Sequence, residues 1–287
     1  MKVFNKIREL DGTRKIYFCG IKIISYKQAV KKIDFSYAIL KYKGVNKAKN
    51  LKNLILGSSH GRDGFVPGKS DFNLSQSSLD LYRIYHLYKY VLKNNGKNLE
   101  NIIVFYSVFH AGLQLEKTSK WKYCIIYKTL YDIKYAFPLA LDDSYLVNEI
   151  NGQIDTVSCP DDFRGKSDNY ENKYESDAKI LVEKHLKNTC RNNNQIKYLA
   201  KLVDMARKHK QNVYVVLPPY RSDYLKHLPE QQVVFRELFE FLDKNKDVKL
   251  LNLQDDKDFI DSDFNSVDHC SEDGGIKLTK KIKKALK

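Results

Sequence analysis

The sequence predicts an α/β fold in which helices cover both faces of a parallel sheet. Short apolar runs, typical of buried strands, alternate along the 287-residue chain with longer stretches whose apolar residues recur at helical spacing. Alternation of this kind is typical of strands that pair in parallel through helical connections. Hydrophobic residues make up 43% of the chain, which is enough for a sizeable core and excludes a disordered protein.

The predicted elements follow one another from residue 53 onward. Each expected strand is a short run rich in Ile, Val and Leu, and these strands are residues 53–56, 101–107, 211–217 and 247–253. Amphipathic helices are expected between and after the strands, at residues 76–94, 192–210 and 231–245 and from about residue 275. Successive strands separated by helices predict that every strand points the same way.

Two segments fall outside this regular order. Residues 1–50 are expected to form a basic N-terminal extension, with two short strands broken at Gly20 in residues 15–26 and a short helix after them. Residues 51–287 are expected to form the main domain, with an insertion at about residues 111–194. Because long irregular insertions often act as lids over a site, we expect this one to be a lid, with a disordered segment as the alternative.

The spacing of the cysteines and the length of the apolar runs argue against several classes of protein. The five cysteines are widely spaced, odd in number and form no CxxC pair, which argues against a disulfide framework and a structural zinc site. No metal is expected. No stretch is apolar over the ~18 residues of a membrane helix, and the first ten residues lack a signal-peptide core. The expected compartment is the cytoplasm, with a peripheral position at the inner membrane face left open.

Positive charge is concentrated at the two ends of the chain. The formal net charge is +15; residues 1–52 hold 12 Lys and two Arg against three acidic residues, and the last eleven residues hold six Lys. Basic ends suit an anionic partner such as membrane lipid, nucleic acid or an acidic glycan, although a solvated Lys-rich surface explains the same composition. No nucleic-acid motif accompanies the charge, so nucleic acid is not an expected partner.

Polar side chains follow the carboxyl ends of the expected strands. Because these ends meet at one edge of a parallel sheet, the residues after them are expected to form one site. They include Ser, His and Asp from four strand ends: Ser58, Ser59, His60, Ser107, His110, Tyr220, Arg221, Asp261, Asp263, Asp268 and His269. These residue types are the ones that acyl transfer through a serine needs.

Ser59 is the candidate nucleophile. A serine hydroxyl is a weak nucleophile that needs an adjacent base, and it needs hydrogen-bond donors for the oxyanion that develops on the acyl carbonyl. The turn from Gly57 to Gly61 would expose a serine and its backbone N–H groups at a strand end. An ordinary strand-to-helix cap is the alternative interpretation of this turn.

Two segments resemble motif blocks of the SGNH (GDSL-like) hydrolase superfamily. LILGSSHG is similar to the first block, in which Gly-Asp-Ser carries the nucleophile; Ser59 matches the Ser, and Ser58 replaces the Asp. FNLSQSS is similar to the second block, in which Asn73 matches an Asn and Ser75 replaces the Gly whose backbone N–H binds the oxyanion. The resemblance implies a flavodoxin-like three-layer α/β/α fold, SGNH-like, with an inserted lid region.

The C-terminal segment FNSVDHCSEDGGIKLTKKI resembles the last block of this superfamily, in its variant from cell-surface polysaccharide biosynthesis proteins. His269 matches the catalytic His and Asp268 matches an Asp of the variant, but Ser266 occupies the position where most members have the orienting Asp. The partner of the imidazole is therefore left open between Asp268, Asp263 and a backbone carbonyl, and a Ser–His dyad is a further alternative.

The third block of the superfamily, Gly-x-Asn-Asp, is not recognisable. The corresponding segment is FYSVFHAG, so either Ser107 or His110 replaces the Asn as an oxyanion donor, or no residue does. His60 is expected to contact substrate or to lie on the surface, because adjacent side chains in a turn rarely face each other. Tyr220 is expected to contact substrate, whereas His185 lies in a Lys-rich segment and is expected to be solvated.

Two further segments, VYVVLPPYRSDYL and RKIYFCGIKIISYK, resemble bacterial capsule and lipopolysaccharide enzymes. The resemblance implies an O-acetyltransferase that moves acetyl from acetyl-CoA to a surface polysaccharide through an acetyl-serine intermediate, with no bound cofactor. The alternatives are an esterase that uses water at the same site and a degenerate fold that only binds glycan or membrane. The second segment is either a surface hairpin or an interfacial anchor on an anionic membrane.

Overall fold

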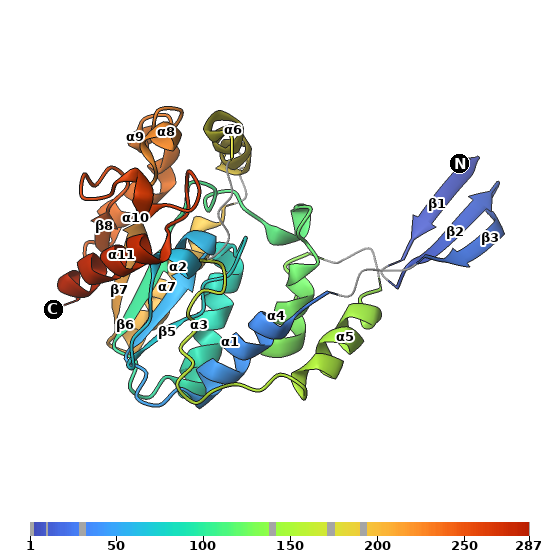
Figure 1. Cartoon of the computed structure of the whole chain (residues 1–287), viewed down its shortest axis with the longest axis horizontal. Helices are drawn as coiled ribbons and strands as arrows, with labels where there is room; N and C mark the ends of the chain where they lie inside the picture. Colours follow the sequence, from blue (N-terminus) through green and yellow to red (C-terminus); the bar gives the residue numbers. More distant parts are fainter. Residues whose placement is uncertain are drawn as a thin grey trace.

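The computed structural model describes residues 3–9, 11–28, 33–137, 142–170, 176–189 and 194–286, which form two separate sheets. The larger sheet is parallel throughout and has the order β5-β4-β6-β7-β8 (Figure 1). Its strands are β4 Asn53–Gly57, β5 Asp71–Asn73, β6 Asn101–Phe105, β7 Asn212–Leu217 and β8 Lys249–Asn252. Counted along the chain this order is 2-1-3-4-5, that of flavodoxin-like folds.

Helices cover both faces of the sheet, so the predicted three-layer α/β/α architecture is confirmed. One layer contains α1 Ser36–Lys47, α3 Leu81–Asn95, α7 Ile196–Lys208 and α10 Arg236–Lys244. The opposite layer contains α2 Ser59–Gly64 and α11 Glu272–Ala285. Side chains alternate between the layers along each strand: Leu54 and Leu56 pack into the first core, and Ile55 packs into the second.

Local sequence explains where the main helices begin and end. The Asp80 side chain accepts a hydrogen bond from the backbone of Arg83 and starts α3 at Leu81, later than the apolar pattern indicates. Ser271 caps α11 in the same way, with acidic residues in the first turn and lysines in the last, as the helix dipole favours. The expected helix over 231–245 is interrupted at Phe235, which separates α9 Gln231–Val234 from α10.

The segment expected as an insertion is mostly helical and serves two parts of the molecule. It contains η1 Leu115–Lys117, α4 Tyr123–Tyr131, α5 Ser144–Ile154 and α6 Ala178–Thr189. Helices α4 and α5 pack beside α1 and extend its layer. Helix α6 lies apart from them, against α8 Ser222–Leu225 at the carboxyl end of the sheet (Figure 1).

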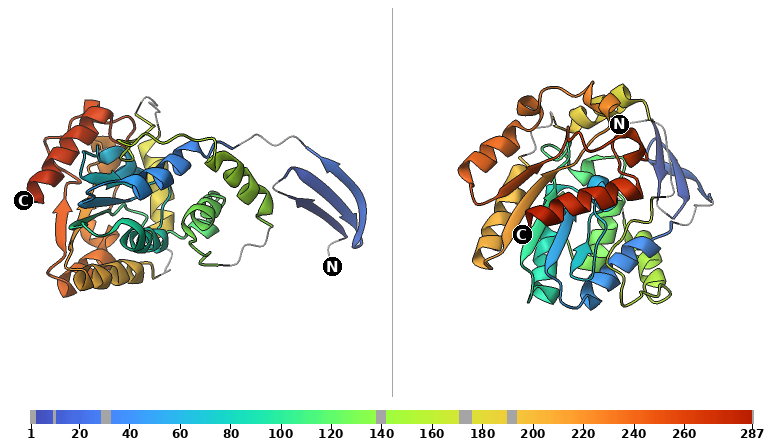
Figure 2. Two further views of the ribbon diagram at one scale, coloured as in Figure 1. Left: turned by 90° about the horizontal axis from the view of Figure 1, so that it is seen from below. Right: turned by 60° about the vertical axis from the view of Figure 1, so that its left-hand side comes forward.

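The N-terminal residues form a second, antiparallel sheet of β1 Phe4–Arg8, β2 Thr13–Phe18 and β3 Ile21–Lys27. The two strands expected around Gly20 are present, and β1 joins them. This sheet extends away from the main body, as Figure 1 and the left-hand view of Figure 2 show. Among the described residues, no helix is long and apolar enough to cross a bilayer.

Candidate active site

Ser59 lies at the carboxyl end of strand β4, as the first residue of α2. The turn between strand and helix requires Gly57, because a Cβ there would lie 2.6 Å from the Cβ of Phe105 on β6. Gly61, one turn into the helix, lies against Ser75, whose Oγ would be 2.6 Å from an added Cβ. The two glycines let α2 start close to the sheet and place Ser59 at its edge.

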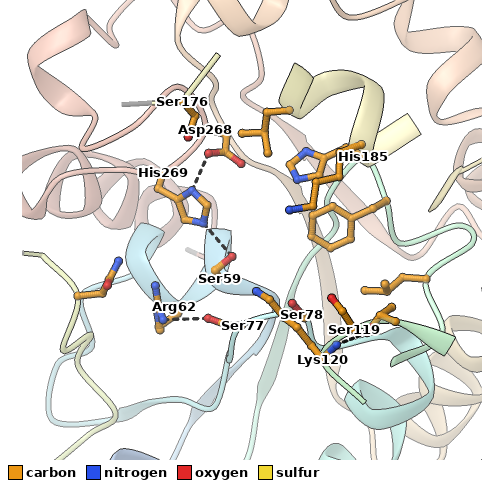
Figure 3. Close-up of a pocket in the computed structure, with 16 residues that line it drawn as sticks. Ser59, Arg62, Ser77, Ser78, Ser119, Lys120, Ser176, His185, Asp268 and His269 are labelled. Atoms are coloured by element: carbon orange, nitrogen blue, oxygen red, sulfur yellow. Dashed lines mark hydrogen bonds and ion pairs between the residues drawn. The ribbon is translucent and has the colours of Figure 1, made fainter. Parts of the chain in front are cut away.

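His269 reaches Ser59 from the loop before α11. Phe264 and Cys270 form an antiparallel bridge, and Asn265 donates its backbone N–H to the carbonyl of His269 at 2.9 Å, so this loop is a tight hairpin. From it the Nε2 of His269 lies 2.8 Å from the Oγ of Ser59 (Figure 3). Two residues 210 positions apart thus stand at hydrogen-bond distance.

Asp268 is the carboxylate that contacts the imidazole. Its Oδ1 lies 2.7 Å from the Nδ1 of His269, and the carboxylate is almost fully buried. Ser266, in the position where the SGNH block has its Asp, donates its hydroxyl to the same oxygen at 3.0 Å. Asp263, the other candidate, instead accepts from Lys277 at 2.5 Å and from the backbone of Ile260.

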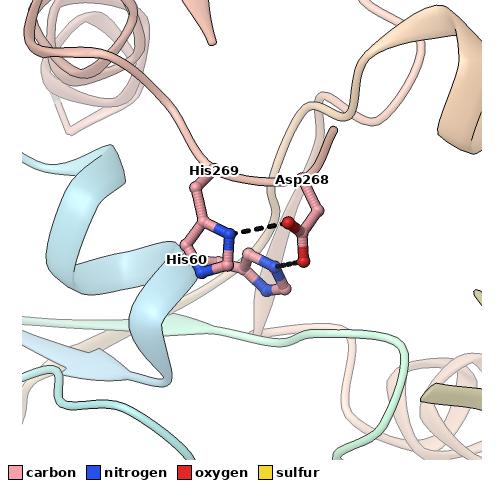
Figure 4. A group of neighbouring side chains, drawn as sticks. All are labelled: His60, Asp268 and His269. Atoms are coloured by element: carbon pink, nitrogen blue, oxygen red, sulfur yellow. Dashed lines mark hydrogen bonds and ion pairs between the residues drawn. The ribbon is translucent and has the colours of Figure 1, made fainter. Parts of the chain in front are cut away.

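The structure corrects the prediction for His60, which is buried and exposes 3% of its surface. Its Nε2 lies 3.0 Å from the second oxygen of Asp268, so this carboxylate is shared by two imidazoles (Figure 4). The Nδ1 of His60 lies 2.6 Å from the Oγ of Ser107, which in turn lies 2.8 Å from the Oγ of Ser58. His60 therefore supports Asp268 from behind and does not face the cavity.

The charges of these groups determine where the protons lie. Burial alone would raise the pKa of Asp268, but the His269 charge and the hydrogen bonds from both rings hold it well below its ordinary value. Burial disfavours protonation of His269, but the charge of Asp268 and its hydrogen bond outweigh burial and raise the pKa of His269. Burial lowers the pKa of His60, and the bond to Asp268 does not offset it. At a pH above the raised pKa of His269, an ionised Asp268 lies between two neutral rings and leaves Nε2 of His269 able to accept the Ser59 proton.

One group of side chains in the described part of the chain has donor atoms close enough for a metal ion. It consists of His60, Asp268 and His269, whose donor atoms lie within 4.8 Å of one another. Two imidazoles and a carboxylate would suit zinc. Each ring nitrogen that faces Asp268 is already at hydrogen-bond distance from a carboxylate oxygen, so ring protons fill the space between the three side chains.

Asn73 and Ser75 do not have the oxyanion-binding geometry expected of them. The Nδ2 of Asn73 donates to the carbonyls of Gly61 and Phe65, both at 2.9 Å, and its Oδ1 accepts from the backbone N–H of Ser75 at 3.0 Å. The carbonyl of Ser75 accepts from the buried Lys41. Both residues are buried and fasten α2 to the sheet, so the Ser75 N–H is already used.

Three other backbone N–H groups belong to residues that line the cavity at the nucleophile. Ser59 occupies the first turn of α2, where a helix provides no acceptor for the amide. Ser77 and Ser78 line the same cavity, and Ser78 has a left-handed backbone with φ of 59°. Among the described residues, the amides of Ser59, Ser77 and Ser78 have no hydrogen-bond acceptor. These are the donors that an oxyanion next to Ser59 could use.

The remaining predicted residues lie behind the site and not in it. Ser107 and His110 are both fully buried, and the backbone N–H of Ser107 donates to the Nδ1 of His110 at 2.6 Å. The other nitrogen of His110 bonds to the carbonyl of Leu79 at 3.0 Å. Tyr220 is buried with its ring 5.4 Å from the ring of His60. These side chains hold His60 in place, so the expectation that they contact substrate or the oxyanion is wrong.

Ser59 and His269 open into a cavity of about 450 Å³ whose other lining residues were not singled out as site residues from the sequence (Figure 3). His185 on α6 lines it, although a solvated position was expected; burial lowers the pKa of His185 to about 3. Its wall also carries cationic, hydroxyl and apolar groups: Arg62, Lys120, Lys184, Ser119, Thr118, Phe109 and Leu113. A sequence signal did exist for this wall, since the insertion was expected to be a lid.

Neither a protein-family model nor a curated protein matches the chain. Similar solved structures include two GDSL-like lipolytic proteins. A GDSL-like lipase from Bacteroides thetaiotaomicron VPI-5482 is 10% identical, with a TM-score of 0.42, over 87% of this chain and 98% of that chain. A lipolytic protein of the G-D-S-L family from Desulfitobacterium hafniense DCB-2 is 10% identical, with a TM-score of 0.39, over 83% of this chain and 100% of that one. These comparisons assign no role to any residue of this chain. The roles of the site residues depend on the contacts described above.

Proposed function

We propose that the protein is an SGNH-type serine acyltransferase that moves an acetyl group from acetyl-CoA to a hydroxyl of a bacterial surface polysaccharide. The observation that carries this proposal is the line of contacts Ser59–His269–Asp268 at the mouth of a cavity, at 2.8 Å and 2.7 Å. A hydroxyl, a neutral imidazole and a buried carboxylate in this order are the elements of serine acyl chemistry.

In the first half of the reaction, Ser59 Oγ attacks the thioester carbonyl while Nε2 of His269 takes the hydroxyl proton. Asp268 stabilises the imidazolium that forms, because its Oδ1 faces Nδ1 of that ring. The amides of Ser59, Ser77 and Ser78 would bind the oxyanion of the tetrahedral intermediate. Collapse of the intermediate breaks the carbon–sulfur bond, and the proton on His269 goes to the CoA thiolate, leaving acetyl-Ser59 and CoA.

In the second half, a sugar hydroxyl attacks acetyl-Ser59 and His269 takes its proton. Collapse then releases the O-acetylated sugar and returns the proton from His269 to Ser59. Water at the same position would give acetate, so an esterase differs from a transferase only in the acceptor. The cavity favours transfer because α6 covers one side of it, and covered sites exclude water.

Charge around the cavity suits both proposed substrates. Arg62, Lys120 and Lys184 line it. Burial lowers the pKa of Lys120, and the charges of Lys184 and Arg62 lower it further. Concentrated positive charge attracts the phosphates of CoA and an acidic glycan. The second candidate, an esterase that removes acetyl groups, needs no such charge but uses the same Ser59 and His269.

The test is mass spectrometry of the purified protein after incubation with acetyl-CoA, followed by a chase with capsule or lipopolysaccharide fragments. Transfer predicts an acetyl adduct on the Ser59 peptide that glycan removes and that Ser59→Ala abolishes. An adduct that decays equally fast without glycan would identify an esterase. Absence of an adduct from thioester and aryl acetate donors alike would indicate a binding scaffold. An adduct on Ser58 in place of Ser59 would show that the nucleophile is misassigned.

A further inference from the structure

The N-terminal sheet, residues 4–27, has two faces of different chemistry. In antiparallel pairs, residues directly opposite each other project from the same face. Phe4, Phe18 and Ile21 form one row across the three strands. Lys6, Ile16 and Ile24 form the next row on the same face. The same face continues with Arg8, Arg14 and Tyr26. We call this set the apolar–basic face: Phe4, Lys6, Arg8, Arg14, Ile16, Phe18, Ile21, Ile24 and Tyr26.

The apolar side chains of this face are exposed to an unusual degree. Ile21 is 68% exposed, Phe4 58%, Tyr26 52% and Phe18 46%. In Figure 1 and in the left-hand view of Figure 2 the sheet lies away from the main body, and no other described element packs as a second layer on it. Small sheets are marginally stable unless a hydrophobic face packs against something. A contiguous apolar patch of this kind marks an interaction surface.

Charge on the sheet is divided between the two faces. On the opposite face, Lys15 pairs with Glu9 at 2.5 Å, and Lys27 lies 3.8 Å from Asp11. The apolar–basic face has no acidic residue among its members, and among the described residues its cations make no ion pair. Its Arg14 donates to the neutral side chain of Gln28 at 3.0 Å. The carboxylates of the sheet therefore pair with cations of the opposite face only.

We infer that the apolar–basic face docks on the surface of an anionic phospholipid bilayer, with Phe4, Phe18 and Ile21 inserted at the level of the headgroups. Exposed aromatic and aliphatic side chains next to unpaired Lys and Arg are the composition of an interfacial anchor. The sheet would then hold the main body at a membrane, which is a property separate from the acyl chemistry of the site.

The charge of the apolar–basic face favours an anionic bilayer over a second copy of the chain as its partner. Two-fold packing of this face on itself would bring Lys6, Arg8 and Arg14 of both copies into one interface with no carboxylate to offset them. Like charges held together in this way destabilise a contact. An anionic bilayer offers the opposite charge and an apolar layer beneath it, which matches both kinds of side chain on the face.

Co-sedimentation of the full-length protein with vesicles tests this inference. We expect binding to phosphatidylcholine vesicles that contain about 30% phosphatidylglycerol, weaker binding at ~1 M salt and little binding to phosphatidylcholine alone. Lys6→Gln with Arg14→Gln should weaken binding about 25-fold, since each basic residue near an anionic surface contributes about fivefold. Binding to neutral vesicles with equal affinity would overturn the inference.

A matched pair of variants tests the assignment of the face. Phe18→Ser removes an aromatic ring from the apolar–basic face, whereas Tyr17→Ser removes one from the opposite face at the neighbouring position of β2. We expect at least a tenfold loss of vesicle binding in the first and less than a twofold change in the second. Equal losses, with amide exchange showing an intact sheet in both, would contradict the inference.

Light scattering tests the alternative that a second copy of the chain covers the apolar–basic face. We expect the wild-type protein and Phe18→Ser to have the same mass in solution at micromolar concentration. A dimer that Phe18→Ser dissociates would show that the face belongs to a second copy, and the membrane assignment would then be wrong. Sedimentation with an acidic polysaccharide but not with anionic vesicles would overturn it as well. None of these measurements depends on whether Ser59 accepts an acetyl group.

Discussion

Asp268→Asn should slow the acyl reaction about 10³- to 10⁴-fold while leaving the fold intact. The carboxylate accepts hydrogen bonds from His269 at 2.7 Å, from His60 at 3.0 Å and from Ser266 at 3.0 Å. An amide of the same shape has one oxygen and one NH₂, so at least one of these donors would face another donor. Loss of the orienting carboxylate in serine triads costs about 10⁴ in kcat, or ~5 kcal/mol.

The pH profile of the same variant gives an independent readout. His269 must be neutral to accept the Ser59 proton, and Asp268 raises its pKa against the effect of burial. Activity of the wild-type protein should therefore rise with pH through a value above about 6.5, the ordinary pKa of histidine. Asparagine removes the negative charge, so this rise should move to lower pH even though the maximal rate falls.

The assay is steady-state release of CoA, or of a chromogenic alcohol from an aryl acetate, between about pH 5 and pH 9. Asp263→Asn is the control, because Asp263 is also a buried acid of the C-terminal loop but contacts Lys277 and not His269. We expect the control to retain activity within about threefold once its thermal stability is taken into account. A rate for Asp268→Asn above a tenth of the wild-type rate, with an unmoved pH profile, would refute the role of Asp268 and indicate a Ser–His dyad.

Three further predictions follow from the same contacts. Ser59→Ala and His269→Ala should each reduce kcat by about 10⁶, and the double variant should lose no more, because the two groups act as a unit; additive losses in the same assay would contradict this. His60→Gln should lower kcat about 10- to 100-fold with KM unchanged, since His60 acts only through its hydrogen bond to Asp268; a raised KM would instead indicate contact with substrate. Asn73→Ala should lower the free energy of unfolding by about 3 kcal/mol, because it leaves buried backbone groups unpaired; a fall in kcat without a fall in Tm would restore its role at the oxyanion.

The fold could be predicted where apolar runs are long enough to specify an element. The strands at residues 53, 101, 212 and 249 and the helices after them follow from such runs. Strand β5 Asp71–Asn73 was missed because three residues with polar ends have no strand pattern of their own. Strand β1 was missed because Phe4–Arg8 mixes apolar with polar and charged residues and has no clear strand pattern. It is defined by its pairing with β2.

The candidate site could be predicted in part, and helix geometry explains the main error. Ser59 and His269 are brought together, and the resemblance to SGNH blocks named both. His60 was expected to contact substrate or to lie on the surface, because adjacent side chains in a turn rarely face each other. Since α2 begins at Ser59, the next side chain is rotated by about 100° and points into the protein. The use of the Ser75 N–H by Asn73 depends on side-chain conformation, which a sequence motif does not specify.

The distance along the chain between Ser59 and His269 has a consequence for biosynthesis. The strand that presents the serine is translated early, whereas its base arrives 210 residues later, in the hairpin before the last helix. During most of translation the serine therefore has no imidazole beside it to take up its proton. On the proposed function, the site would become complete only when α11 docks beside α2 and the hairpin closes over the sheet.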